Sequence, residues 1–194
     1  MRSAQPVINP TAAVSAVPKG RPPRFFTGRF SPTGPNRPAE RLILALKDRK
    51  DRAGVAFLAG ELADCLRKTT VLPEDALVTF VPRSRKAILR TGTDQAMELA
   101  AALAKVCKLD FGATLRHTGV SGVQKELSTE ERRLHAGAAY QIRKEISDLQ
   151  GRTVVLVDDI LTTGATFEAC AGLLRQAGAG EIFCLSAGRR EQIR

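Results

Sequence analysis

Two adjacent acids and a group of threonines follow an apolar run, and these residue types at this spacing could bind a sugar phosphate. The run Val154–Val157 is aliphatic and mostly β-branched, which predicts a strand buried in the centre of a sheet. Asp158 and Asp159 come directly after it. Neighbouring carboxylates repel each other and are costly to bury, so they need hydrogen-bond donors. Vicinal ribose hydroxyls would supply a donor to each acid.

A turn rich in threonine follows the acids and opens a predicted helix over 164–177. Its residues are Thr162, Thr163, Gly164, Ala165 and Thr166. Hydroxyls and the unpaired N–H groups of a helix start would surround one point, which suits a phosphate, and the glycine permits close approach. A strand ending in Asp with a Thr helix cap is common without any ligand. The whole combination nevertheless favours a ribose 5-phosphate site.

The thirteen residues Val154–Thr166, VVLVDDILTTGAT, resemble the phosphoribosyl pyrophosphate signature of type I phosphoribosyltransferases. The resemblance implies that Asp158 and Asp159 are the catalytic acids, which contact the ribose hydroxyls, and that the turn 162–166 holds the 5′-phosphate. It implies Mg²⁺ as cofactor, bridged mainly by ligand oxygens, with the two acids nearby or acting through water. It also implies transfer of a phosphoribosyl group to an acceptor base that the sequence does not identify.

The wider chain, from Leu42 to Gly188, resembles the ComF/GntX family, which is associated with DNA uptake and competence. The residues that carry this resemblance are Ala45–Lys47, Leu58–Ala59, Val81–Pro82, Gln95, Glu98–Ala100, Gln124, Leu127, Arg132 and Tyr140. Three features depart from the family. The N-terminal cysteine-rich module is absent from this sequence, the Arg-Gly-aromatic-Asn segment reads Arg90–Asp94, and His135 replaces an expected Asn.

Two basic segments would complete a site for a pyrophosphate-bearing ligand. Arg83, Ser84 and Lys86 follow a predicted strand over 76–81 and correspond to the pyrophosphate loop of the resembled fold, although a basic loop is often merely solvated. The polar stretch 116–133 suits a hood that closes over substrate and excludes water, with Lys125 and Arg132 as its cations. An ordinary exposed loop is the alternative for this stretch.

Helix and strand periodicities alternate along the rest of the chain. Helical spacing is found over 42–46, over 55–66 and after Asp94, where Met97 and Cys107 are expected on the inward face. Strands are expected over 76–81, 110–115, 152–159 and 181–187. This order predicts an α/β fold, a Rossmann-like parallel sheet flanked by helices, with ligands at the carboxyl ends of its strands.

Composition divides the chain into a flexible, basic, Pro-rich tail over 1–38 and a phosphoribosyltransferase-like domain over 39–194. The tail carries six of the ten excess positive charges and no acid, so single-stranded DNA is a candidate partner. The four cysteines read as buried thiols of a reducing compartment, and no apolar stretch suits membrane insertion, so we expect a cytoplasmic protein. A homodimer and a non-catalytic role in ligand sensing or DNA handling stay open as alternatives.

Overall fold

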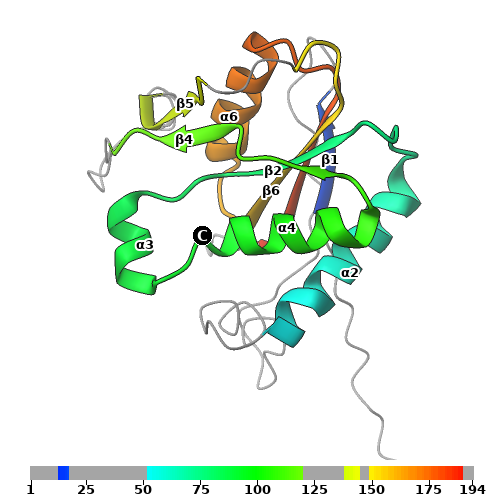
Figure 1. Ribbon diagram of the computed structural model, residues 1–194, viewed down its shortest axis with the longest axis horizontal. Coiled ribbons are helices and arrows are strands. Elements are labelled where there is room, and N and C mark those ends of the chain that lie inside the picture. The colour runs from blue at the N-terminus through cyan, green and yellow to red at the C-terminus, as the bar shows by residue number, and fades with distance from the viewer. Residues whose placement is uncertain (1–12, 18–51, 120–137, 145–148, 190–194) are drawn as a thin grey trace, which may run out of the picture.

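A computed structural model of the chain describes residues 13–17, 52–119, 138–144 and 149–189. Figure 1 shows its helices and strands around one central sheet. In chain order they are β1 (Ala13–Val17), α2 (Arg52–Thr69), β2 (Leu77–Phe80), α3 (Arg85–Thr91), α4 (Gln95–Cys107), β3 (Asp110–Phe111), β4 (Leu115–His117), β5 (Tyr140–Ile142), β6 (Val154–Leu161), α6 (Ala165–Gln176) and β7 (Ile182–Arg189).

The central sheet has the strand order β1-β7-β6-β2-β3. The strands β3, β2, β6 and β7 are parallel, and β1 pairs antiparallel with β7 at one edge. Leu77 pairs with Val154 and Phe80 with Val157, so β2 and β6 run in step up to the two acids. The predicted α/β class with a parallel sheet is confirmed.

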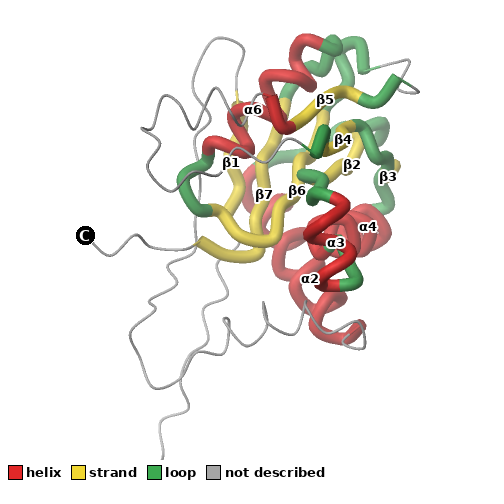
Figure 2. Tube along the Cα trace, turned by 90° about the vertical axis from the view of Figure 1, so that its left-hand side faces the viewer, coloured by secondary structure: helices red, strands yellow, loops and turns green. Residues whose placement is uncertain are grey.

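Side chains of the strands alternate between two cores, one on each face of the sheet. On one face, Val155 and Val157 of β6 pack with α2 and α4, whose contacts include Leu62 and Leu99. On the other face, Val154 and Leu156 pack against α6. Figure 2 shows α2, α3 and α4 on one side of the sheet and α6 on the other. A strand buried on both faces requires such a continuous apolar run, which is why β6 reads so clearly in the sequence.

The predicted strand over 110–115 divides into two strands of different sheets. Asp110 and Phe111 pair with β2, and the backbone N–H of Gly112 donates to the Val78 carbonyl at 3.1 Å. Leu115 then begins β4, which pairs antiparallel with β5 in a separate two-stranded sheet. The apolar pattern alone could not show that the partner strand changes within six residues.

Several other predictions need correction. Within the predicted tail, residues 13–17 form β1, which adds to the otherwise open edge of β7 through backbone pairs such as Val14 with Leu185. The rest of the tail and the predicted helix at 42–46 lie outside the described residues. Met97 is 40% exposed, because the buried face of α4 passes through Ala96, Leu99 and Leu103 instead. Cys65 and Cys107 are only partly buried, whereas the other two cysteines are buried.

Candidate functional site

The two acids lie where β2 ends and β6 continues. β6 extends to Leu161, pairing with β7 beyond the last β2 pair at Phe80 and Val157. The segment after β2 leaves directly beside the acids, because the N–H of Val81 donates to the Val157 carbonyl at 2.9 Å. Asp158 and Asp159 therefore lie beside the carboxyl end of β2, in the last part of β6 that still pairs with β7. A ligand crevice is expected at this edge of a parallel sheet.

Burial and charge repulsion act together on Asp158. Burial of its carboxyl raises the pKa of Asp158 well above the usual range, and the neighbouring Asp159 charge raises it further. The N–H of Asp159 donates to Asp158 Oδ1 at 2.8 Å, and the N–H of Ile160 donates to Asp159 Oδ1 at 2.8 Å. Both acids are partly buried, and such a pair is costly, so a ligand that donates hydroxyls or brings a cation would relieve a cost already present.

The backbone conformation of the turn 162–166 suits the binding of an anion. Gly164 occupies the N-cap position of α6 with a φ of 84°, a left-handed conformation that favours glycine, and no side chain caps the helix there. Thr162 and Thr163 are exposed, and Thr163 Oγ1 accepts only a long bond of 3.4 Å from the Ala165 N–H. The positive end of the twelve-residue helix α6 thus faces a turn of hydroxyls.

Tyr140 on β5 joins this site, and sequence analysis gave it no role. Burial raises the pKa of Tyr140 far above its usual value, with the nearby charge of Asp158 also raising it, while a hydrogen bond with Thr166 lowers it. The phenol therefore stays protonated and can donate a hydrogen bond at neutral pH. Its position depends on the pairing of β4 with β5, which short and irregular sequence patterns do not reveal.

The predicted pyrophosphate loop is shorter than the sequence suggested. Ser84 caps α3 by accepting from the Ala87 N–H at 3.2 Å, so its hydroxyl is partly engaged. Lys86 lies in the first turn of this short helix rather than in a loop, and it is exposed. Arg83 differs from the other two residues because its guanidinium is held by α4, where Nη1 donates to Gln95 Oε1.

Asp94, the last residue of the segment that departs from the resembled family, is a second residue for which no role at the site was predicted from the sequence. Its side chain is 5% exposed and accepts the Arg83 N–H at 3.1 Å and the Met97 N–H at 3.3 Å. Burial raises the pKa of Asp94, the two backbone hydrogen bonds and the Arg83 charge lower it, and the Asp159 charge raises it. The Asp94 carboxylate thus interacts electrostatically with Arg83, in the basic segment after β2, and with Asp159 in β6.

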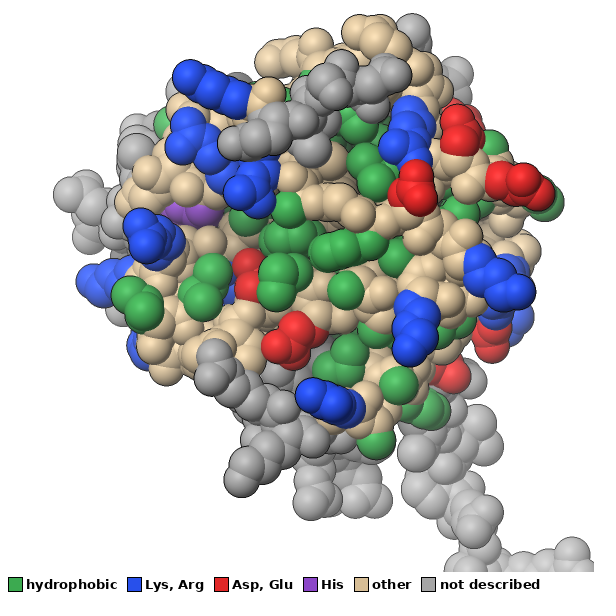
Figure 3. Space-filling view, in the orientation of Figure 1, with side chains coloured by type: hydrophobic (Ala, Val, Ile, Leu, Met, Phe, Trp, Pro, Cys, Tyr) green, Lys and Arg blue, Asp and Glu red, His purple; other side chains and the backbone are tan. Residues whose placement is uncertain are grey.

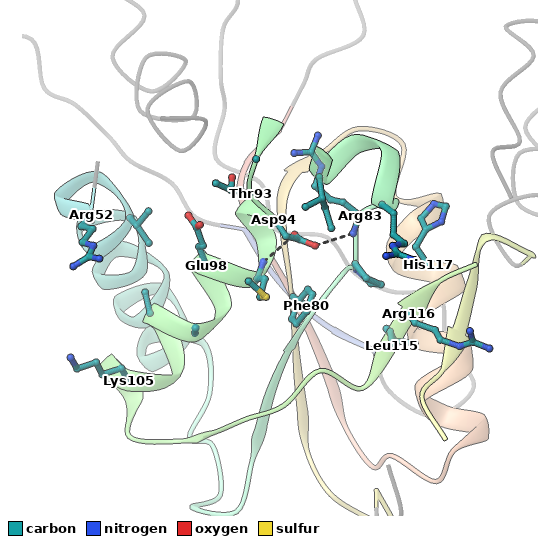
Figure 4. A pocket seen from close by; sticks show the side chains of 18 of the residues that line it. Arg52, Phe80, Arg83, Thr93, Asp94, Glu98, Lys105, Leu115, Arg116 and His117 are labelled. Carbon is teal, nitrogen blue, oxygen red and sulfur yellow. Dashed lines mark hydrogen bonds between the residues drawn. The ribbon is translucent and has the colours of Figure 1, made fainter. Parts of the chain in front are cut away.

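A groove of about 1150 Å³ opens beside these residues, between α2, α3 and α4 and the strand β4. Its floor is apolar and includes Phe80, Pro82 and Leu115, and Figure 3 shows apolar side chains gathered at the centre of this face. Its basic lining residues are Arg52, Arg83, Arg85, Lys105, Arg116 and Arg143, against two acids, Asp94 and Glu98. Figure 4 shows Asp94 and Arg83 near the middle of the groove.

The structure brings two of the predicted site segments together. The acids in the last part of β6 lie next to the Arg83 segment that follows β2, because β2 and β6 are neighbouring parallel strands. Residues 158–166 do not line the groove, so the groove is separate from the predicted phosphate turn. The hood residues Lys125 and Arg132 lie outside the described residues.

The donor set fits a magnesium ion carried by a ligand better than one held by protein alone. Within the described residues, no group of three or more His, Cys, Asp or Glu side chains could hold a metal ion. The oxygen donors of Asp158 and Asp159 suit Mg²⁺ in kind, but Mg²⁺ commonly takes one or two carboxylates together with waters and substrate phosphates. The residues present therefore fit a Mg²⁺ ion that is held mainly by ligand phosphates and waters, with Asp158 and Asp159 nearby.

A family model described as "Phosphoribosyl transferase domain" matches residues 87–192, which is more than half of the chain. The chain belongs to this phosphoribosyltransferase domain family. The matched region begins in α3 and includes the two acids of β6, the turn 162–166 and the whole of α6. The family therefore agrees with the resemblance carried by Val154–Thr166.

Known relatives of this phosphoribosyltransferase domain differ in what their names describe. The DNA utilization protein YhgH of Escherichia coli K12 is 32% identical over 123 residues, covering 61% of this chain and 52% of that protein. The adenine phosphoribosyltransferase of Mycobacterium tuberculosis is 32% identical over 129 residues, covering 66% of this chain and 52% of that protein. The ribose-phosphate pyrophosphokinase of Methanopyrus kandleri is 37% identical over 93 residues, covering 47% and 26%.

The chain spans only about a quarter to a half of the length of these three relatives. Among solved structures, a hypoxanthine phosphoribosyltransferase from Staphylococcus aureus aligns with a TM-score of 0.45 at 18% identity, covering 72% of this chain and 68% of that chain. Among the helices that the structure describes, none has the length and apolar character needed to cross a membrane.

Proposed function

We propose that this phosphoribosyltransferase domain binds phosphoribosyl pyrophosphate and transfers its phosphoribosyl group to a nitrogen acceptor. The observation that carries the proposal is the arrangement at the end of β6. Two partly buried acids are followed within five residues by Gly164, which starts α6 in a left-handed conformation without a capping side chain. The helix dipole, the backbone N–H groups and the threonine hydroxyls there favour a phosphate, and the carboxylates that precede them in the chain favour a diol.

Each predicted residue has a role in this proposal. Asp158 and Asp159 accept hydrogen bonds from the ribose hydroxyls and stabilise the positive charge that develops on the ribose as pyrophosphate leaves. The turn 162–166 holds the 5′-phosphate, and Arg83, with Ser84 and Lys86 as neighbours, binds the pyrophosphate. Lys125 and Arg132 belong to a hood that excludes water. Mg²⁺, carried by the ligand, would neutralise charge on the leaving pyrophosphate.

The transfer breaks the bond between the ribose anomeric carbon and pyrophosphate and forms a bond from that carbon to the acceptor nitrogen. Pyrophosphate leaves with the bonding electrons, and the acceptor gives up a proton. The groove lined by Arg83 and Asp94 supports the proposal, because it leaves room for an acceptor beside the proposed pyrophosphate loop.

Calorimetry tests the proposal directly. Titration of phosphoribosyl pyrophosphate into the protein should release or absorb heat in a saturable way that requires Mg²⁺. Asp158→Asn and Asp159→Asn should each weaken binding by about tenfold or more, because a charge-assisted hydrogen bond contributes about 1.5–3 kcal/mol. Asp64→Asn on the exposed surface of α2 is the matched control and should bind as the unaltered protein does. Absence of any saturable binding to the unaltered protein would refute the proposal.

A second candidate function is the handling of single-stranded DNA. Two observations favour it, namely the match to a DNA utilization protein and the six cations that line the groove. Binding of an oligonucleotide through these cations and the basic tail should weaken steeply with added salt. Replacement of the six cations of residues 1–38 by serine keeps the residues of β1 and should lower the affinity and the salt dependence together. An affinity that neither salt nor these replacements change would argue against this function.

A further inference from the structure

The connection between β2 and α4 has little packing of its own. Its helix α3, Arg85–Thr91, has seven residues and no buried residue, and Leu89 on it is 84% exposed. So short a helix is marginal by itself, and most helical stability in proteins comes from a packed apolar face. What holds this connection in place must therefore lie largely at its two ends.

Asp94 joins those two ends. One carboxylate oxygen, Oδ2, accepts the N–H of Arg83 at the start of the connection, at 3.1 Å. The other, Oδ1, accepts the N–H of Met97 in the first turn of α4, at 3.3 Å. A single buried side chain thus closes an eleven-residue loop and fixes its first residue to a helix whose inward face is packed on the sheet. Figure 4 shows both bonds as dashed lines from Asp94.

Gln95 makes the same connection through the side chain of Arg83. Gln95 is 1% exposed, and its Oε1 accepts from Arg83 Nη1. Within the described part of the chain, Nε2 of this buried amide has no hydrogen-bond partner. Arg83 is therefore held at both its backbone and its guanidinium by two consecutive residues of α4's beginning.

The hydrogen bonds from Arg83 to Asp94 and Gln95, here called the clamp, act at the proposed pyrophosphate site and do not involve the phosphate turn. Val81 is still hydrogen-bonded to the β6 strand, so Arg83, two residues later, is the first position whose placement depends on Asp94. The turn 162–166 is placed by β6 and α6 instead, whereas the Asp94 carboxylate accepts its hydrogen bonds from the N–H groups of Arg83 and Met97. Loss of the clamp should disturb one half of the site only.

We propose that Asp94, supported by Gln95, is a positioning residue that holds Arg83 where it meets the pyrophosphate of the bound ligand. This inference rests on the proposed binding of phosphoribosyl pyrophosphate. Here an acid replaces the Asn of the resembled family segment, and an acid can accept both N–H groups at once, whereas the single carbonyl oxygen of Asn cannot hold both in this geometry.

The test compares phosphoribosyl pyrophosphate with ribose 5-phosphate, which lacks the pyrophosphate. By calorimetry with Mg²⁺, Asp94→Ala should weaken binding of phosphoribosyl pyrophosphate by about tenfold or more, while the affinity for ribose 5-phosphate stays within about twofold. Asp94→Asn should lie between the unaltered protein and Asp94→Ala. Asp64→Ala, which removes an exposed acid of α2, is the matched control and should change neither affinity.

The outcomes separate this inference from the proposed function. If the unaltered protein binds neither ligand, the proposed function fails. If it binds both, the inference is overturned by an Asp94→Ala variant that loses both affinities equally or keeps both. Circular dichroism checks that each variant is folded at the temperature used, and Asp94→Asn, which retains an oxygen for the α4 cap, supplies the comparison if Asp94→Ala does not fold.

Discussion

At the scale of single residues, Asp158 and Gly164 of the proposed site are each expected to lower the stability of the folded state. Asp158 is an acid whose pKa is raised by burial and by Asp159, and Gly164 holds a backbone conformation that other residues rarely adopt. Neither feature helps the chain to fold. Such local costs commonly gather at functional sites, because a ligand supplies the interaction that the protein alone lacks.

Asp158→Asn should make the protein more stable at neutral pH while weakening its ligand binding. The folded state holds the Asp158 proton more tightly than the unfolded chain, so the free energy of unfolding falls as pH rises above the ordinary Asp pKa. The stabilisation by Asn should therefore be present at pH 7 and shrink as the pH falls toward about 4. Urea unfolding at several pH values measures it, with exposed Asp64→Asn as control. Destabilisation at pH 7 would contradict the account.

Gly164→Ala should lower the free energy of unfolding by about 1–2 kcal/mol, because an L-residue at a φ of 84° is strained. It should also weaken binding of ribose 5-phosphate. Gly172→Ala in the same helix is the matched control. An added Cβ there meets nothing within 4 Å, so the variant should gain about 0.5–1 kcal/mol and bind normally. Equal stability changes in both variants would show that the left-handed conformation is not required.

At the scale of elements, β6 and α6 carry both the core and the site. The same α6 that presents its start to the proposed phosphate buries Phe167, Cys170 and Leu174 against β6 and β7. Packing along the helix therefore sets the position of its first turn. Binding should be sensitive to the α6 core even where the altered side chain touches no ligand.

Phe167→Ala should lower the free energy of unfolding by about 3–5 kcal/mol, because it empties a fully packed position near the start of α6. Phe57→Ala in α2 removes the same side chain from a position that is 47% exposed and should cost much less. Urea unfolding of both variants gives the comparison. Similar costs for the two would mean that α6 is not packed as described.

The sequence predicted those parts of the fold whose signal is local. The run before Asp158 and the glycine at 164 specify a buried strand and a helix start, and both are found where expected. Pairings across the chain could not be predicted, because β1 and the β4–β5 pair depend on backbone hydrogen bonds that side-chain patterns barely encode. The part played by Asp94 was hidden for the same reason, since its partner Arg83 lies across an intervening helix.

At the scale of the whole molecule, two cores on opposite faces of one sheet keep the carboxyl ends of the strands aligned. The reactivity of the cysteine thiols depends on this packing. Burial raises the pKa of Cys184 to about 12 and that of Cys170 well above its usual value, whereas Cys65 and Cys107 are only partly buried. A thiol reacts as its thiolate, so the pattern of labelling reads out the integrity of the sheet.

In the native protein at pH 8, a thiol reagent should modify Cys65 and Cys107 slowly and leave Cys170 and Cys184 unmodified over the same time. In denaturant all four should react. Mass spectrometry of peptides after timed labelling identifies the sites. Rapid modification of Cys184 in the native state would contradict the packing of β7 between its neighbours.

The central claim is that the end of β6 and the start of α6 form a ribose 5-phosphate site. A crystal structure of the protein with phosphoribosyl pyrophosphate and Mg²⁺ tests it most directly. The account predicts the 5′-phosphate within hydrogen-bond distance of the backbone N–H groups of 162–166 and the ribose hydroxyls on Asp158 and Asp159. A ligand bound elsewhere, with its phosphates on the cations of the groove and the turn left empty, would contradict it.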